Sequence, residues 1–314
     1  MKVLSLVDLT DKQKQELEEI KGVDLSVVSA KSATAEDLKG VEVLFDWSKR
    51  LQDDIISSET LNWIQTIRAG VDALPLRALD EKGIMLTTGS GANSINIAEQ
   101  ALTYMLMFER SMNLSTWDQT KKVWHREKKY DEVYNKTVML VGVGHIGSQL
   151  AQYAKALGMH TIGVRHSDKD LPNIDKMVAM KDIDKHLKEA DFVVNSLPDT
   201  ADTEKMFNKE FFQKMAKTAY FISIGRGKST STDDLVEALQ TKEIAGAGLD
   251  VVDPEPLNED SPLWDMKNVI LTPHNAGRSV HYEERAFKIF KKNLKSYIEN
   301  GEVVENLVSY SKGY

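Results

Sequence analysis

The sequence has no cysteine among its 314 residues, and no apolar run in it approaches the roughly 18 residues of a membrane span. The lack of cysteine excludes disulfides, thiolate nucleophiles and cysteine-ligated zinc, and it suits a reducing compartment. The start of the chain, Met1–Asp8, is too short and ends too acidic for a secretory signal. We therefore expect a cytoplasmic protein with no membrane partner.

Basic side chains are scarce relative to acidic ones. The 40 lysines and arginines against 48 aspartates and glutamates give a net charge of −8, which argues against nucleic acid as a partner. Hydrophobic residues at 41% and charged residues at 28% describe an ordinary globular chain. At about 150 residues per domain, the length predicts roughly two domains.

Short apolar runs alternate with helical stretches in the N-terminal part, and this predicts a parallel α/β layer. We expect strands at Val3–Val7, Val27–Ser29, Val41–Phe45 and Trp63–Ile67, with a helix at Asp11–Ile20. A long apolar helix is expected from about Ile97 to Met112.

The alternation restarts after Lys136. The expected strands there are Val138–Val141, Thr161–Val164, Phe192–Asn195, Tyr220–Ile224, Gly246–Leu249 and Val269–Leu271. The last expected helix runs from about Tyr282 to Glu299 and is amphipathic.

The stretch Val138–Val141 leads into a glycine fingerprint with Gly142, Gly144 and Gly147, which encloses His145 and Ile146 and opens a predicted helix. Gly142 permits a tight turn, Gly144 lets the backbone approach a pyrophosphate, and Gly147 lets helix and strand pack closely. The helix N-terminus then faces the phosphates. A bare fingerprint is weak evidence, but here strand, helix and a following strand all fall in place, so we expect a dinucleotide site.

The end of the next strand indicates which dinucleotide binds. A site selective for NAD offers an acid there to the ribose hydroxyls. This chain has Arg165, His166 and Ser167 instead, which suit a 2′-phosphate. We expect NADP(H) to be preferred, with NAD(H) as the alternative and a solvated loop as the simplest reading of Arg165.

Three further stretches carry polar residues at the ends of predicted strands. They are Phe221–Gly227, Ala247–Leu257 and Leu271–Gly277. In an open α/β sheet, ligands bind beyond the carboxyl ends of the strands, so these stretches are expected to meet at one site.

Together these motifs resemble the D-isomer-specific 2-hydroxyacid dehydrogenase family, in its glyoxylate/hydroxypyruvate reductase-like branch. The resemblance runs over nearly the whole chain, from Ala69–Asp72 through Ala98–Leu102 and the glycine fingerprint to Pro273 and His274. It implies an α/β fold of two Rossmann-like domains with doubly wound parallel sheets and a cleft between them. The substrate domain is expected to comprise residues 1–97 and 286–314, and the dinucleotide-binding domain residues 98–285.

The family resemblance also implies the site residues. The family's catalytic arginine, glutamate and histidine match Arg226, Glu255 and His274. The family's loop whose backbone holds the substrate carboxylate matches Ala69 and Gly70. The expected substrate-binding residues are therefore Ala69, Gly70, Arg226 and His274. The expected cofactor-binding residues are Gly142, Gly144, His145, Ile146, Gly147, Arg165, His166, Ser167, Leu197, Pro198, Ile224, Gly225, Arg226, Asp250, His274 and Gly277, with Asp250 at the nicotinamide end.

The chemistry of these side chains fits the reduction of a 2-keto acid. Arg226 offers fixed N–H donors to the carboxylate and the adjacent carbonyl. His274 supplies the proton as hydride reaches the carbonyl carbon, and Glu255 stabilises the imidazolium. No metal is expected, because Arg226 and His274 already polarise the carbonyl.

The segment Ser115–Lys136 carries Trp117, Trp124, Tyr130 and Tyr134 among many charges. Aromatic and basic residues together are typical of interfaces, and family members pair two cofactor domains through this region. We expect a homodimer through residues 99–136, against the alternative that these rings pack on their own domain.

Some positions and readings stay open. Ser90 stands where the family usually has proline, and Arg68 where relatives often have a small residue. Trp47 is expected either in the substrate pocket or in the core, and Lys49, Arg50 or Arg68 can take a phosphate, as in a phosphoglycerate dehydrogenase. A dinucleotide-sensing binding protein of the same fold is the alternative from another class. The sequence does not fix which 2-keto acid is used.

Overall fold

The structure is a computed structural model that describes residues 1–71, 73–127, 129–166 and 169–311. The chain divides into two compact units, Met1–Ala92 with Val280–Tyr314, and Asn93–Ser279. Both junctions lie a few residues before the sequence-based boundaries at 97/98 and 285/286. Ile97 packs in the core of the second unit, whereas the Tyr282 hydroxyl donates to the carbonyl of Ile67 in the first.

Among the described residues, the first unit holds a parallel sheet of five strands in the order β2-β1-β3-β4-β5. The strands are β1 (Lys2–Ser5), β2 (Asp24–Val27), β3 (Val43–Phe45), β4 (Trp63–Gln65) and β5 (Met85–Thr87). Around it lie α1 (Asp11–Glu18), α2 (Gln52–Ser57), α3 (Leu76–Glu81), α9 (Tyr282–Asn300) and the 3-10 helices η1 (Ala35–Leu38) and η2 (Lys49–Leu51).

Both faces of this sheet are buried, as is usual when all strands are parallel. Leu4, Leu44 and Ile64 belong to one core cluster. Phe45 belongs to the other and stacks on Phe290 of α9, with ring centroids 4.1 Å apart. Alternate residues of each strand therefore point into different cores, which explains the continuous apolar runs in the sequence.

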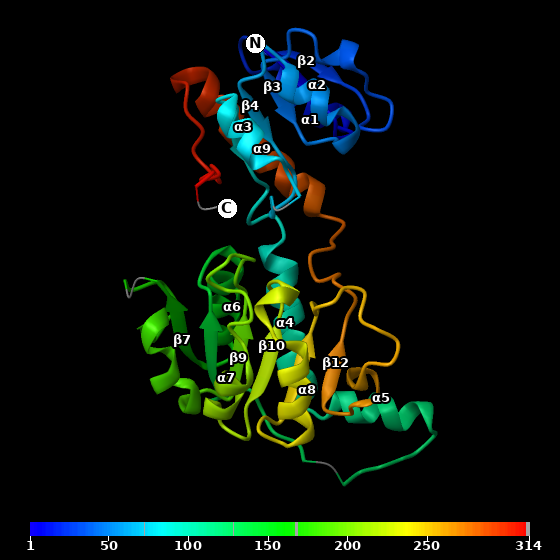
Figure 1. Ribbon diagram of the computed structural model, residues 1–314, viewed down its shortest axis with the longest axis vertical. Coiled ribbons are helices and arrows are strands. Elements are labelled where there is room, and N and C mark those ends of the chain that lie inside the picture. The colour runs from blue at the N-terminus through cyan, green and yellow to red at the C-terminus, as the bar shows by residue number, and fades with distance from the viewer. Residues whose placement is uncertain (72, 128, 167–168, 312–314) are drawn as a thin grey trace. The chain divides into compact units, whose positions relative to one another are not determined.

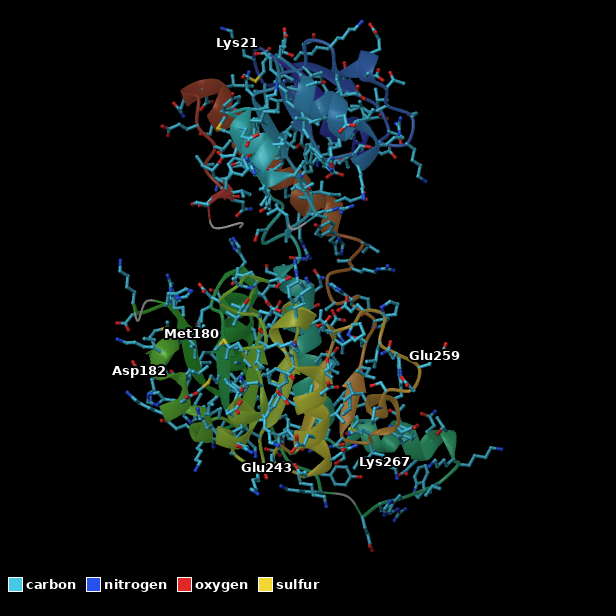
Figure 2. All side chains as sticks on the ribbon, in the orientation of Figure 1. Lys21, Met180, Asp182, Glu243, Glu259 and Lys267 are labelled. Carbon is cyan, nitrogen blue, oxygen red and sulfur yellow. The ribbon has the colours of Figure 1, made fainter. Side chains whose placement is uncertain are left out.

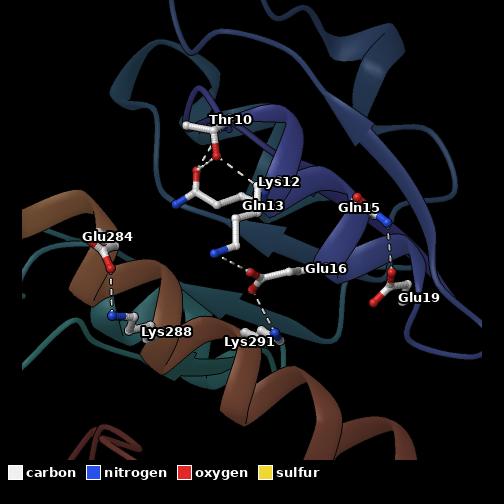
Figure 3. Close-up of polar contacts among 9 residues, drawn as sticks. All are labelled: Thr10, Lys12, Gln13, Gln15, Glu16, Glu19, Glu284, Lys288 and Lys291. Carbon is white, nitrogen blue, oxygen red and sulfur yellow. Dashed lines mark hydrogen bonds and ion pairs between the residues drawn. The ribbon is translucent and has the colours of Figure 1, made fainter.

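The C-terminal helix α9 is tied to α1 by an ion pair, so the end of the chain returns to its beginning (Figure 3). Lys291 Nζ lies 2.7 Å from Glu16 Oε2. Helix α1 starts at a capping box in which Thr10 and Gln13 satisfy each other's backbone N–H groups.

In the second unit, the described residues form a parallel sheet of seven strands in the order β12-β11-β10-β9-β6-β7-β8. The strands are β6 (Thr137–Val141), β7 (His160–Arg165), β8 (Lys176–Ala179), β9 (Phe192–Asn195), β10 (Tyr220–Ser223), β11 (Gly246–Leu249) and β12 (Val269–Leu271). Around them lie α4 (Ser94–Glu109), α5 (Met112–Thr120), α6 (His145–Ala156), α7 (Lys209–Lys214), α8 (Thr232–Gln240), η3 (Met180–Lys185), η4 (Leu187–Glu189), η5 (Gly227–Ser229) and η6 (Pro262–Asp265).

This sheet is doubly wound (Figure 1). Met105 of α4 and Leu150 of α6 lie in the cluster on one face, whereas Phe212 of α7 and Leu235 of α8 lie in the cluster on the other. Strand order reverses between β6 and β9, so the chain runs to one side of β6 through β8 and then to the other. The α/β class with doubly wound parallel sheets is confirmed.

Several elements differ from the sequence-based expectation. The strand expected at Val27–Ser29 lies at Asp24–Val27, and β5 and β8 were not anticipated. The helix expected from Ile97 to Met112 breaks at Ser111, which has a left-handed φ of 48° and donates from Oγ to the carbonyl of Lys129 over 2.6 Å.

The outside of both units carries many charged side chains. Figure 2 labels exposed examples, among them Lys21 of the first unit and Glu259 and Lys267 of the second. Within the described ranges, no helix combines the length and the apolar character that crossing a membrane requires.

Candidate active site

The ends of neighbouring strands in the second unit lie side by side. Val141 of β6 pairs with Asn195 of β9, and Asn195 pairs with Ser223 of β10. Ser223 pairs with Leu249 of β11, which pairs with Leu271 of β12. The loops that follow these strands therefore leave the sheet at one edge. They carry the residues predicted for cofactor binding and catalysis in this unit, apart from those that follow β7.

The glycine loop after β6 has the geometry that a dinucleotide requires. Gly142 has a φ of 96°, which favours glycine. A Cβ on Gly147 would lie 2.3 Å from the carbonyl oxygen of Gly142, so only glycine lets α6 pack this close to the turn. A Cβ on Gly144 would meet no atom within 4 Å, and Gly144 is the N-cap of α6. The exposed helix N-terminus, with His145 and Ile146 in its first turn, thus fits a pyrophosphate.

Strand β7 ends at Arg165, which is half-buried, and the exposed His166 follows it. Ser167, the third residue predicted for the 2′-phosphate, lies outside the described residues. Neither Arg165 nor His166 is the kind of acid that selects NAD ribose.

A buried asparagine joins the loops after β9 and β10. Asn195 Nδ2 donates to Ser229 Oγ over 2.7 Å, and Asn195 Oδ1 accepts from the backbone N–H of Leu197 over 3.0 Å. A Cβ on Gly225 would lie 2.6 Å from the carbonyl oxygen of Leu197, so the two loops touch there. The predicted residues Leu197 and Gly225 are therefore neighbours. Pro198 follows on the exposed side and Ile224 is buried.

Arg226 follows Gly225 and is half-buried. Its Nη1 donates to the carbonyl of Gly225 over 3.1 Å, and its own carbonyl accepts from Ser229 Oγ over 2.6 Å. A Cβ on Gly227 would lie 1.8 Å from the carbonyl oxygen of Val252, so the loops after β10 and β11 are also in contact. The backbone of Arg226 is thus fixed, and within the described residues its guanidinium makes no hydrogen bond besides the one to Gly225, which leaves most of its donors for a ligand.

His274 and Glu255 form a pair, with Nδ1 2.7 Å from Oε2. Because a carboxylate only accepts, Nδ1 carries the proton, which leaves Nε2 as the ring nitrogen for a substrate. Glu255 Oε1 accepts from the backbone N–H of Val252 over 3.1 Å, which fixes the carboxylate. The His274 side chain is 51% exposed, so a substrate can reach it.

Asp250, at the end of β11, holds the loop that carries His274. The side chain is buried, and Oδ1 accepts from Thr272 Oγ1 over 2.5 Å and from the backbone N–H of Asn275 over 3.0 Å. The backbone N–H of Ala276 lies 3.1 Å from Oδ2. These bonds restrain the loop in which His274 adopts a φ of 48°. Gly277 follows and is half-buried.

One residue that the sequence did not single out, Tyr104, completes this arrangement. The Tyr104 hydroxyl on α4 lies 2.5 Å from Thr272 Oγ1, across 168 residues of chain. No local motif could have revealed that contact, although the Thr272–His274 stretch was recognised. A pocket of about 540 Å³ opens beside the pair, lined by Asp250, Glu255 and His274 and by apolar side chains such as Trp264.

The first unit holds the other predicted substrate residues. Ala69 and Gly70 lie in the loop after β4 and are half-buried, and the exposed Arg68 precedes them. The backbone N–H of Gly89 donates to the carbonyl of Arg68 over 2.9 Å, which links this loop to the one that contains Ser90. Asp72, part of the matched motif, lies outside the described residues.

The structure reduces the alternatives that the sequence left open for Trp47, Lys49 and Arg50, which lie in the segment after β3. Trp47 packs against the core of the first unit, in line with the core alternative. Arg50 Nη2 donates to the carbonyls of Ala30, Lys31 and Ala33, so its guanidinium is engaged within the unit. Lys49 is exposed. Of the three cations considered for a phosphate, Lys49 and Arg68 remain.

Comparison with known proteins shows the family to which this chain is similar. A family model described as D-isomer specific 2-hydroxyacid dehydrogenase, NAD binding domain, matches residues 102–276. A D-3-phosphoglycerate dehydrogenase of Methanocaldococcus jannaschii is 32% identical over 297 residues, which cover 93% of this chain and 56% of that protein. A glyoxylate reductase of Thermococcus kodakarensis is 30% identical over 272 residues, which cover 83% of this chain and 81% of that protein.

A solved structure is similar as well. The NADPH-dependent glyoxylate/hydroxypyruvate reductase of Sinorhizobium meliloti, in complex with NADP and sulfate, has a TM-score of 0.80 and 25% identity, with 100% of this chain and 99% of that chain covered. The family resemblance inferred from the motifs is confirmed, and a nicotinamide dinucleotide is the cofactor class that the matched domain binds. The chain belongs to the D-isomer-specific 2-hydroxyacid dehydrogenases, oxidoreductases that act on the CH–OH group of their donors.

Proposed function

We propose that this protein reduces a small 2-keto acid, such as glyoxylate, hydroxypyruvate or a branched relative, to the D-2-hydroxy acid with NADPH. The observation that carries the proposal is the His274–Glu255 pair, with 2.7 Å between Nδ1 and Oε2, at the same sheet edge as Arg226 and the glycine loop. Proton donor, anion-binding guanidinium and dinucleotide cradle thus belong to one set of loops.

In the proposed reaction, Arg226 binds the substrate carboxylate and the adjacent carbonyl oxygen. The bound cofactor supplies the hydride that reaches the carbonyl carbon. His274 gives the proton on Nε2 to the carbonyl oxygen, so a C–H and an O–H bond form as the C=O double bond becomes single. Glu255 accepts from Nδ1 throughout and stabilises the imidazolium before the transfer. In the oxidative direction, His274 takes the proton back.

The backbone amides of Ala69 and Gly70 are proposed as further donors to the substrate carboxylate, as the family resemblance implies. The proposed preference for NADPH is supported by Arg165 at the end of β7 and by the lack of an acid among the described residues there. Of the solved relatives, the Sinorhizobium meliloti enzyme is named as NADPH-dependent.

A phosphoglycerate dehydrogenase activity is the second candidate. It is favoured by the Methanocaldococcus jannaschii relative, of whose length the chain spans 56%, and by the exposed Lys49 and Arg68 in the first unit. It predicts that a phosphorylated substrate is strongly preferred over its unphosphorylated counterpart.

A panel assay tests both candidates. The purified protein is assayed with glyoxylate, hydroxypyruvate, phosphohydroxypyruvate and branched 2-keto acids, each with NADPH and NADH in parallel. Preference for an unphosphorylated acid with NADPH supports the proposal. Preference for phosphohydroxypyruvate supports the second candidate. Tight cofactor binding with negligible turnover of every acid would contradict both and indicate a dinucleotide-sensing protein.

We also propose a homodimer through residues 99–136, located in the cytoplasm. Its support is the exposure of apolar side chains in this segment: Trp124 is 87% exposed, Val123 51% and Tyr134 62%. Such exposure is typical of association surfaces. Trp117 is half-buried, with Lys121 Nζ 5.7 Å from its ring centroid, so this tryptophan packs partly on its own helix.

A further inference from the structure

A tyrosine from α4 reaches the loop that carries His274. Tyr104 is 1% exposed, and its ring lies against β11 at Gly248. A Cβ on Gly248 would come within 2.7 Å of this ring, so the glycine in the strand makes room for it. The ring is thereby held with its hydroxyl 2.5 Å from Thr272 Oγ1.

The direction of the hydrogen bonds follows from the chemistry of the three groups. The Asp250 carboxylate only accepts, so the single hydroxyl proton of Thr272 is donated to Asp250 Oδ1 over 2.5 Å. The Tyr104 hydroxyl must then donate to Thr272. Burial raises the pKa of Tyr104, more than its hydrogen bonds to Thr272 and Gln100 lower it, so the tyrosine stays a neutral donor. Each donation in such a chain polarises and strengthens the next.

The two carboxylate oxygens of Asp250 accept hydrogen bonds from different sets of donors. Oδ1 accepts from Thr272 Oγ1 and from the backbone N–H groups of Asn275 and Ala276. Oδ2 accepts from Ala276 N–H over 3.1 Å and from no other donor among the described residues. Asp250 also lines the pocket beside His274, so Oδ2 keeps the capacity to accept from a ligand there.

We propose that the Tyr104 hydroxyl is a positioning group for the nicotinamide end of the site, acting through Thr272 to hold Asp250 with Oδ2 able to accept from the cofactor as well. The proposal rests on the proposed function and on the family resemblance, which implies that Asp250 lies at the nicotinamide end of the cofactor. It assigns a role to a residue on α4, outside all the strand-end loops. If the Tyr104 hydroxyl only supported the fold, its removal would lower the stability of the protein. It would not weaken the binding of the nicotinamide end of the cofactor in particular.

The test compares two ligands that differ only at the nicotinamide end. Dissociation constants are measured by calorimetry for NADPH and for 2′-phospho-ADP-ribose, which lacks the nicotinamide, with NADH and ADP-ribose as a second pair. The variants are Tyr104→Phe and Thr272→Val, with Thr272→Ser to restore the hydroxyl. Tyr220→Phe is the matched control, because it removes a hydroxyl from the same unit at the opposite end of the sheet.

We expect Tyr104→Phe and Thr272→Val to weaken NADPH binding about threefold to tenfold, the worth of one hydrogen bond, and to leave 2′-phospho-ADP-ribose within about twofold. Thr272→Ser and Tyr220→Phe should bind both ligands as the unmodified protein does. Equal weakening of both ligands, no weakening of NADPH, or the same loss in Tyr220→Phe would overturn the proposal. Failure of the unmodified protein to turn over any keto acid would count against the proposed function alone, since the dissociation constants still report on Tyr104.

Discussion

His274 and Glu255 meet side chain to side chain, with Nδ1 2.7 Å from Oε2, although they belong to loops after two different strands. The contact between the two side chains also depends on how the backbone of His274 is held by a residue other than Glu255. His274 has a left-handed φ of 48°, and its backbone N–H donates to the carbonyl of Asp250 over 2.9 Å. The proposed general acid is thus oriented from both sides, by a carboxylate at its ring and by Asp250 at its backbone.

Two substitutions in the glycine loop are expected to change different properties, one the stability of the protein and the other its binding of NADPH. Gly147→Ala places a methyl group 2.3 Å from the Gly142 carbonyl oxygen, so it should destabilise the protein by about 1–3 kcal/mol. Gly144→Ala meets no protein atom within 4 Å, so it should keep the melting temperature while weakening NADPH binding about tenfold or more, because the methyl faces the pyrophosphate. Thermal melts and cofactor titrations separate the two. Tight NADPH binding by Gly144→Ala would contradict the assignment of this loop.

Arg165 is expected to set cofactor preference. The unmodified enzyme should favour NADPH over NADH in kcat/KM by at least about tenfold, which is about 1.4 kcal/mol. Arg165→Asp should erase or reverse that ratio, because an acid at this strand end repels the 2′-phosphate and accepts from ribose hydroxyls. Arg165→Lys, which keeps the positive charge at this position, is the control and should retain the preference for NADPH. Equal use of both cofactors by the unmodified enzyme would show that Arg165 does not select NADPH over NADH.

The arm at residues 115–136 is expected to hold two chains together. Light scattering should give a mass near twice 35.3 kDa, and replacing Trp117 and Trp124 with serine should shift the protein towards monomer. Because Trp124 is 87% exposed, its replacement removes little packing within the chain. A 35.3 kDa species at micromolar concentration for the unmodified protein would rule the dimer out.

Glu109, at the end of α4, is expected to make stability depend on pH. Burial raises the pKa of this carboxyl; Asp131 and Asp191 add to the effect, whereas Lys136 and Lys129 oppose it. A raised folded-state pKa favours the protonated form, so stability falls as pH rises from the ordinary carboxyl pKa through the folded one. Glu109→Gln should therefore raise the melting temperature at neutral pH and lose this advantage below the ordinary carboxyl pKa. The exposed Glu132→Gln is the control, and a lower melting temperature for Glu109→Gln at neutral pH would refute the account.

The sequence predicted those parts of the fold that depend on local pattern. Apolar runs located strands such as Phe192–Asn195 and Gly246–Leu249 to the residue. The glycine spacing identified a turn. The structure shows why this turn needs glycine, since Gly147 packs closely against Gly142. The family motifs then indicated Arg226, Glu255 and His274, because each follows a strand.

What the sequence could not reveal depends on contacts between distant segments. Ser111 breaks the long helix through a bond to the carbonyl of Lys129, and nothing in the apolar period indicates that break. Strand β8 is only four residues long and begins with a lysine, so its place at the sheet edge is set by pairing with β7. Tyr104 looks like an ordinary core aromatic until its hydroxyl is found beside Thr272.

The most direct test of the account is the product formed from hydroxypyruvate and NADPH by the unmodified protein and by His274→Ala, analysed for rate and chirality. The account predicts D-glycerate from the unmodified enzyme, and a kcat about 10²–10⁴ lower for His274→Ala with NADPH binding nearly intact. An L-product, or a His274→Ala variant that keeps most of the unmodified kcat, would contradict it.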